Sequence, residues 1–98
     1  MELTGKQKAY LRGLAHTLNP VVFVGREGVS EAVGRKTHLE LNAHELIKVR
    51  IGDGAEESTE AVAESLVAAT SAALVQRIGH VVVLYRKRKK DPEIVLPD

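Results

Sequence analysis

Residues 21–30 read VVFVGREGVS, and this stretch joins a short apolar run to the start of a helix. The apolar and mostly β-branched residues 21–24 are typical of a buried strand. Gly25 and Gly28 bracket two further residues, and Ser30 is a favourable helix N-cap. Glycines at both ends of a turn expose the amides between them, next to the positive end of the helix dipole. The stretch therefore predicts a strand-to-helix junction suited to binding a phosphate group.

The sequence in and after this GxxG loop, whose inner residues are Arg26 and Glu27, excludes two common kinds of phosphate site. The loop is not followed by the Lys-Ser/Thr pair of a Walker motif, and it lacks the third glycine of a dinucleotide fingerprint. KH-type domains use a GxxG loop to clamp a nucleic-acid backbone. We expect Arg26 to contact phosphate, whereas the carboxylate of Glu27 repels phosphate unless it points away. The alternative is a plain tight turn, which two glycines at this spacing commonly form.

Composition limits the chain to one small domain with an aliphatic core. The 98 residues are 44% hydrophobic, without cysteine or tryptophan, and the aromatic residues are Tyr10, Phe23 and Tyr85. A disulfide and a thiolate metal site are excluded, and the histidines do not occur at metal-ligand spacing. No segment has the roughly 18 consecutive apolar residues of a membrane span. We expect a soluble cytoplasmic protein without a membrane partner, cofactor or metal.

The charges are segregated along the sequence. Residues 53–64 contain five acids and no base, which leaves fourteen bases against eight acids elsewhere. A ligand responds to the field within about a Debye length, roughly 8 to 10 Å, and not to the molecular sum. We therefore expect one basic face and one acidic end, the alternative being solvated surface of no particular function.

The spacing of apolar residues predicts three helices and four strands. Thr4 and Gln7 have capping-box spacing at the start of a helix over 4–17, whose apolar positions are Leu11, Leu14, Ala15 and Leu18. A strand at 21–24 is followed by a helix from Ser30 to about Asn42, whose inward positions are Val29, Val33, Thr37 and Leu41. A strand at 45–51 alternates, with Leu46, Lys48 and Arg50 on one face and Ile47, Val49 and Ile51 on the other. The last expected elements are a helix capped by Ser58 or Thr59 with apolar positions Val62, Leu66, Ala69, Thr70 and Ala73, and a hairpin of 74–78 and 81–86 around Gly79-His80.

This order, α-β-α-β-α-β-β, predicts an α/β fold: a single small domain with a mixed four-stranded sheet and three helices. Right-handed crossovers are expected to make the first three strands parallel neighbours, and the last strand is expected to be antiparallel. Residues 86–98 begin with the charge run RKRKKDP and are expected to form a basic, mobile tail. Its last part, EIVLP, is expected to fold back as a short apolar clip.

Three separated stretches resemble, in order and over nearly the whole chain, the CRM domain family and its stand-alone bacterial YhbY-like members. They are LTGKQKAYLRGLAHTLNPVVFVGREGVSEAV, HELIKVRI and IGHVVVLYR. The resemblance implies a fold similar to the C-terminal domain of translation initiation factor three. It also implies binding of structured RNA, with stand-alone members associating with precursors of the large ribosomal subunit.

The resemblance and the charge pattern together predict a set of RNA-contacting residues. The resemblance supplies the loop, the basic first helix and basic positions of the sheet, and the charge pattern adds basic residues near the loop and after the last strand. The set is Lys6, Lys8, Arg12, Gly25, Arg26, Glu27, Gly28, Arg35, Lys36, Lys48, Arg50, Arg86 and Lys87. Many relatives have small or basic residues inside the loop, so the acidic Glu27 is a departure from that pattern.

The predicted function is non-catalytic binding of large-subunit ribosomal RNA or its precursor particle by a monomer. No clustered acid and base suggests an enzyme, and the serines have no nearby base in sequence. The scarcity of aromatic residues argues against base stacking, so shape and phosphate contacts are expected to dominate. The alternative function is a protein-interaction adaptor that docks on ribosomal or assembly proteins.

Overall fold

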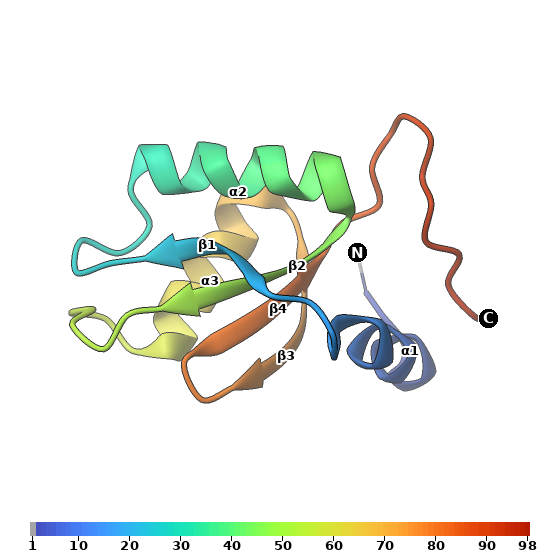
Figure 1. Ribbon diagram of the computed structural model, residues 1–98, viewed down its shortest axis with the longest axis horizontal. Coiled ribbons are helices and arrows are strands. Elements are labelled where there is room, and N and C mark those ends of the chain that lie inside the picture. Colours follow the sequence, from blue (N-terminus) through green and yellow to red (C-terminus); the bar gives the residue numbers. More distant parts are fainter. Residues whose placement is uncertain (1) are drawn as a thin grey trace.

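Residues 2–98 are described by a computed structural model, in which three helices and four strands follow one another in the predicted order (Figure 1). The α/β class and the mixed sheet are thereby confirmed. No helix within this described part is both long and apolar enough to cross a membrane. The elements are α1 (Gly5–Ala15), β1 (Pro20–Val24), α2 (Glu31–His44), β2 (Leu46–Ile51), α3 (Thr59–Thr70), β3 (Ala73–Ile78) and β4 (Val81–Tyr85).

The strands are ordered β1-β2-β4-β3, with β1 parallel to β2 and β4 antiparallel to both of its neighbours. The antiparallel last strand confirms the prediction, but the expectation that β2 and β3 are neighbours is wrong. The two-residue turn at Gly79-His80 returns β4 alongside β3, and the other edge of β4 pairs with β2 over its whole length. β1 and β3 are therefore the edge strands of the sheet.

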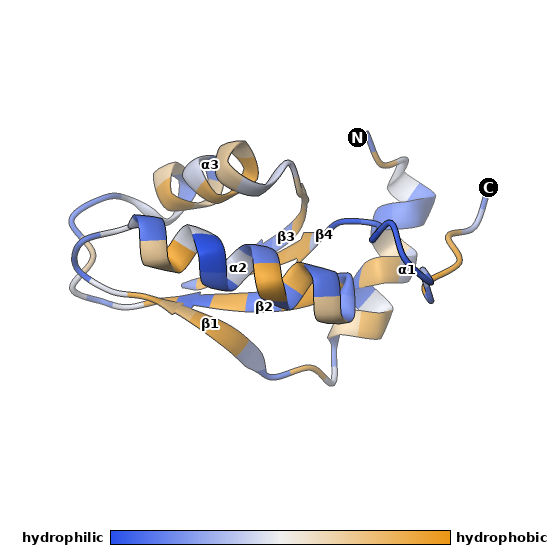
Figure 2. Cartoon of the chain, turned by 90° about the horizontal axis from the view of Figure 1, so that it is seen from above, coloured by the Kyte–Doolittle hydropathy of each residue, from blue (hydrophilic) through white to orange (hydrophobic). Residues whose placement is uncertain are grey.

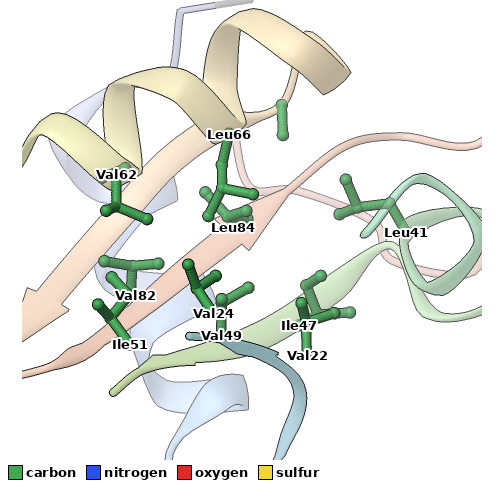
Figure 3. Close-up of a cluster of buried hydrophobic side chains, with 12 residues drawn as sticks. Val22, Val24, Leu41, Ile47, Val49, Ile51, Val62, Leu66, Val82 and Leu84 are labelled. Carbon is green, nitrogen blue, oxygen red and sulfur yellow. The ribbon is translucent and has the colours of Figure 1, made fainter. Parts of the chain in front are cut away.

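Helices α2 and α3 lie side by side over one face of the sheet and enclose the main hydrophobic core (Figures 2 and 3). The alternation of β2 is as predicted, with Ile47, Val49 and Ile51 pointing into this core. The predicted inward positions of α2 are confirmed. In α3, Ala69 is exposed because it lies on the outer side of the helix, and Ala73 belongs to β3.

Helix α1 packs on the opposite face of the sheet and covers only part of it (Figure 1). Leu11 and Ala15 are buried against Leu46 and other residues of β2, β3 and β4. Leu14 is 40% exposed, contrary to expectation, because the buried side of this short helix is narrower than the predicted apolar stripe. The same face remains open near the carboxyl end of β1, where Phe23 is 65% exposed.

Side-chain caps fix the start of each helix. Thr4 and Gln7 form the predicted capping box of α1, and Ser30 and Ser58 accept hydrogen bonds from Val33 N and Ala61 N at the starts of α2 and α3. Each such cap satisfies one amide that has no partner within the helix, which is worth about 1 kcal/mol. The beginnings of the helices were therefore predictable to within a residue.

The C-terminal segment after β4 is held by one buried carboxylate. Glu45 accepts hydrogen bonds from the backbone N–H groups of Arg88 (3.0 Å), Glu93 (2.7 Å) and Ile94 (3.0 Å). Ile94, together with Leu96, packs on the cluster under α1, which confirms the expected clip. The expected mobility of residues 86–98 stays a prediction, but these bonds tie residues 88–94 to the end of α2 through an acceptor that the sequence does not announce.

Candidate nucleic-acid interface

The loop between β1 and α2 is a hydrogen-bonded turn with its two polar residues at the tip. Gly28 N donates to the carbonyl of Gly25 (3.1 Å), and Ser30 N donates to the carbonyl of Gly28 (3.0 Å). Gly28 has a φ of +73°, a conformation that favours glycine. The side chains of Arg26 and Glu27 are exposed, and the loop leads directly into the capped first turn of α2.

Backbone amides at this loop are free to bind an anion. Among residues 2–98, the N–H groups of Arg26, Glu27 and Val29 donate no hydrogen bond to the protein. The positive end of the α2 dipole lies beside them. The arrangement therefore combines unpaired donors, one guanidinium and a helix N-terminus, which suits a phosphate group.

An acidic loop lies next to this candidate phosphate site. The loops following β1 and β2 are at the same end of the molecule (Figure 1), where Gly52 N donates to the carbonyl of Val24 (2.8 Å). A Cβ placed on Gly28 would lie 2.9 Å from Oε1 of Glu57. This carboxylate opposes phosphate binding on one side of the loop, so an approaching backbone is favoured from the Arg26 side.

Two other acids of this region are paired with the β3–β4 hairpin. Asp53 lies 3.6 Å from His80, and Glu60 lies 3.0 Å from Arg77. The predicted acidic end therefore exists, but part of its charge is neutralised locally. Of the acids of this region without an ion pair within residues 2–98, Glu57 faces Gly28 of the GxxG loop, whereas Glu64 lines a hollow with Lys8.

The predicted basic residues of α1 lie at the opposite end of the molecule from the GxxG loop (Figure 1). Lys6 is exposed, and Lys8 lines a hollow that also contains Glu2 and Glu64. Arg12 lines a different hollow of about 300 Å³, which opens between α1 and the sheet and which also contains Lys48. Of these three cations, Arg12 is thus the one that shares a hollow with a basic residue of the sheet.

Lys48 and Arg50 of β2 point away from the main core, as the alternation of the strand predicted. They lie on the open part of the sheet face, between α1 at one end and the GxxG loop at the other. Among residues 2–98, no carboxylate is within 4.0 Å of the charged groups of Arg12, Lys48 or Arg50. This face therefore carries uncompensated positive charge.

Arg35 and Lys36 lie on the outer surface of α2, where each pairs with an acid one turn away. The distances are 3.2 Å to Glu31 and 3.0 Å to Glu40, and the pairs are of the i,i+4 kind. The pair with Glu31 is exposed, and such pairs contribute about 0.3 to 0.5 kcal/mol, so a phosphate can replace that carboxylate. Glu40 is half-buried, so Arg35 is the more available of the two for contacts near the loop.

Arg86 lies between the carboxyl ends of α2 and α3 and is engaged by them. Its guanidinium donates to Thr70 O (2.8 Å), His38 O (3.2 Å) and Asn42 Oδ1 (2.9 Å), and one nitrogen is 2.9 Å from His38 Nδ1. Burial lowers the pKa of this guanidinium from its ordinary value. These contacts give Arg86 a role in the fold, since it satisfies the Thr70 carbonyl that the end of α3 leaves unpaired.

Lys87 lies beside a basic hollow of about 600 Å³ formed by the run that follows β4. The hollow also contains Arg88, whose side chain donates to the carbonyl oxygens of Asn42 (3.3 Å) and Ala43 (2.7 Å) at the end of α2. The role of Arg88 was missed, because a basic run reads as a uniform solvated segment.

No three His, Cys, Asp or Glu side chains converge on a metal position anywhere in residues 2–98.

Comparison with known proteins decides the family. A sequence model of the CRS1/YhbY (CRM) domain matches residues 3–86. The chain belongs to the CRM family. It is 45% identical over 95 residues to a Haemophilus influenzae protein named "RNA-binding protein", a match covering 97% of this chain and 95% of that protein. It is 44% identical over 95 residues to a Bacillus subtilis protein named "Probable RNA-binding protein YqeI", with coverage of 97% and 99%.

The fold of this CRM chain is also that of a solved relative. The solution structure of SAV1595 from Staphylococcus aureus, described as an RNA-binding candidate, matches it with a TM-score of 0.83 and 42% identity. The match covers 98% of this chain and 100% of that one. The family resemblance expected from the sequence is therefore confirmed.

Within the CRM chain, the predicted site residues form three groups rather than one cluster. The first is the GxxG loop with the outer surface of α2, the second is the open sheet face with Arg12, and the third is the basic run after β4. Lys6 and Lys8 lie apart from these groups on the remaining surface of α1. The sequence did not predict this grouping, because grouping depends on which sheet face α1 covers.

Proposed function

We propose that this CRM-family chain is an RNA-binding protein that catalyses no reaction. The observation that carries the proposal is the exposed guanidinium of Arg26 beside the unpaired amides of Arg26, Glu27 and Val29. Relatives named as RNA-binding proteins support it, because they match nearly the whole chain, including this loop.

In the proposed complex, one phosphate sits against the loop amides and the Arg26 side chain. Donors fixed by the turn need no reorganisation when the anion arrives, and a charge-assisted hydrogen bond is stronger than a neutral one. Gly25 and Gly28 keep side chains away from the approaching backbone, and Glu27 projects into solvent at the other tip position. The loop thus acts as the fixed point of the interface.

From this point, the RNA backbone is proposed to follow the cations away from the acidic loop. One branch passes Arg35 and Lys36 on α2, and the other crosses Arg50 and Lys48 toward Arg12. Lys6, Lys8 and Lys87 then add longer-range attraction without setting the register. Glu57 and its neighbours disfavour the reverse orientation.

We further propose that the RNA is large-subunit ribosomal RNA or its precursor particle, bound in the cytoplasm by a monomer. The support is the resemblance of the LTGKQKAY, GREG and HELIKVRI stretches to stand-alone bacterial CRM proteins. Assembly precursors offer structured RNA whose phosphates are not yet covered by ribosomal proteins.

Crosslinking in cells, followed by sequencing of the attached RNA, tests this function. We expect the reads to concentrate at one region of large-subunit ribosomal RNA, and to fall for Arg26→Ala at equal protein level. Reads spread over unrelated transcripts would contradict the ribosomal target. Protein partners that survive ribonuclease treatment, without crosslinked RNA, would instead support the adaptor alternative.

A further inference from the structure

An aromatic side chain stands exposed on the sheet, two residues before the GxxG loop. Phe23 is 65% exposed, the largest exposed fraction among the big apolar residues of the helices and strands. Its neighbours Val22 and Val24 are buried in the main core, so strand alternation directs Phe23 to the opposite face. A single exposed apolar side chain is common on protein surfaces, so its neighbours on the sheet decide whether it marks a site.

Phe23 belongs to a row of side chains that crosses the open part of the sheet. The strand registers pair Phe23 with Arg50, Arg50 with Val81, and Val81 with Ile78. Ile78, at the far edge, is 57% exposed. At about 4.8 Å per strand, the row is about 14 Å long. It presents an apolar ring and a guanidinium side by side.

The charge around this row is positive. Arg50 and Lys48 lie on the same strand and face, and Arg12 shares a hollow with Lys48 and Ile78. Carboxylates are absent within 4.0 Å of these three cations over residues 2–98. A ligand complementary to this face carries negative charge and a flat apolar surface at close spacing.

We propose that the open sheet face binds a single-stranded RNA segment, with one base stacked on Phe23 and the adjacent phosphates at Arg50 and Lys48. The inference rests on the proposed RNA-binding function and extends it from phosphate contacts to base stacking. It also departs from the expectation from composition that stacking plays little part. A duplex is a poor occupant, because its bases are already stacked on one another.

The position of Phe23 connects the two parts of the site. Only Val24 separates it from Gly25, so a strand whose phosphate sits on the loop places a neighbouring base near the ring.

A second copy of this chain is a less suitable occupant of the open sheet face. Two identical faces packed about a twofold axis would bring Arg50 and Lys48 near their own copies, a juxtaposition of like charges that disfavours binding.

Two variants of Phe23 separate stacking from the other contacts. Phe23→Leu keeps an apolar side chain on the strand and removes the aromatic ring. We expect it to weaken binding of a single-stranded RNA by about fivefold or more, because stacking contributes about 1 to 3 kcal/mol per base. Binding of a duplex RNA with the same number of phosphates should not change. Arg26→Ala, as the control, should weaken both.

Phe23→Trp gives a direct signal, because the chain has no other tryptophan. Stacking of a base on the indole should quench its fluorescence when single-stranded RNA is added, and duplex RNA should quench it much less. Far-ultraviolet circular dichroism and sedimentation of both variants check that fold and oligomeric state are kept.

The outcomes distinguish failure of the inference from failure of the function. Equal loss on both RNAs for Phe23→Leu, or no loss on either, overturns the stacking proposal while the wild-type protein still binds RNA. Self-association of the wild-type protein that Phe23→Leu abolishes assigns the face to a second copy and also overturns it. Absence of binding by the wild-type protein to either RNA rejects the RNA-binding function itself.

Discussion

Glu45 is a buried carboxylate in a backbone conformation that is unusual for a residue other than glycine. Its side chain is 1% exposed, its backbone has a φ of +65°, and its own N–H donates to Leu41 O as the C-cap of α2. Burial raises the pKa of its carboxyl, but the amides of Ile94, Arg88 and Glu93 and the Arg88 charge outweigh burial and lower the pKa below its ordinary value. Burial, together with the negative charge of Glu45, raises the pKa of the Tyr85 phenol.

Replacement of Glu45 by glutamine should destabilise the protein. The amide cannot accept all three backbone hydrogen bonds at once, because one of its positions is a donor. A buried donor without an acceptor costs about 1 to 3 kcal/mol, so we expect a loss of this size for Glu45→Gln in urea unfolding at neutral pH. Glu31→Gln, which alters only an exposed pair with Arg35, should change stability by less than about 0.5 kcal/mol.

The pH dependence of stability follows from the direction of the Glu45 shift. Because its pKa is lower in the folded chain than in the unfolded chain, the ionised carboxylate stabilises the fold above the unfolded pKa of about 4.3. That contribution disappears as the pH falls through the lowered folded pKa. The free energy of unfolding should therefore fall below about pH 4.3 more steeply for wild type than for Glu45→Gln. Parallel curves for the two proteins would contradict this role.

Glu57 is the residue that we expect to limit affinity at the GxxG loop. Its carboxylate faces Gly28 and repels a phosphate seated on the loop amides. Glu57→Gln should tighten RNA binding about two- to fivefold at low salt, the effect of one screened charge at roughly 6 Å. Glu56→Gln removes the same charge from a neighbouring exposed position and should have a smaller effect. Equal gains for both variants would show that only net charge matters.

At the level of helices and strands, local chemistry was enough to predict most of the fold. The Thr4 and Gln7 capping box, the Ser30 cap and the Gly79-His80 turn are short-range signals, and the structure contains each of them. Gly79 has a φ of +57°, as a two-residue hairpin turn containing glycine favours. Such features depend on neighbours in sequence, which is why they were predictable.

The features that were not predictable depend on long-range neighbours. A continuous apolar run at residues 21–24 reads as a buried strand, and nothing in it indicates that β1 lies at an edge with Phe23 in solvent. The insertion of β4 between β2 and β3 is likewise a matter of pairing across the sheet. The burial of Glu45 was likewise not predictable, because its partners come from residues 88–94.

Helix α2 contains a glycine that lowers its stability without a packing reason. Gly34 lies in the helix interior, and a Cβ built there meets no heavy atom within 4 Å. Gly34→Ala should raise the free energy of unfolding by about 0.5 to 1 kcal/mol, from helix propensity and reduced freedom of the unfolded chain. Gly28→Ala should do the opposite, since its φ is +73° and Glu57 blocks the Cβ position. Urea titrations of both variants measure the contrast.

At the scale of the whole molecule, the distribution of charge along the long axis gives the proposed RNA interface a direction. The longest dimension is 38 Å, with the GxxG and acidic loops at one end and α1 with the C-terminal segment at the other (Figure 1). The open, uncompensated cations of the sheet face lie between these ends. An RNA strand that contacts both the loop and Arg12 must therefore cross Arg50 and Lys48, which gives the proposed interface its polarity.

The salt dependence of RNA binding tests most directly whether phosphate contacts carry this interface. With about four to six phosphates neutralised, log affinity should fall against log salt with a slope of about −3 to −5, and Arg26→Ala should make the slope shallower by about 1. A filter-binding series on both proteins measures these slopes. A slope near zero, or one that Arg26→Ala leaves unchanged, would contradict the account.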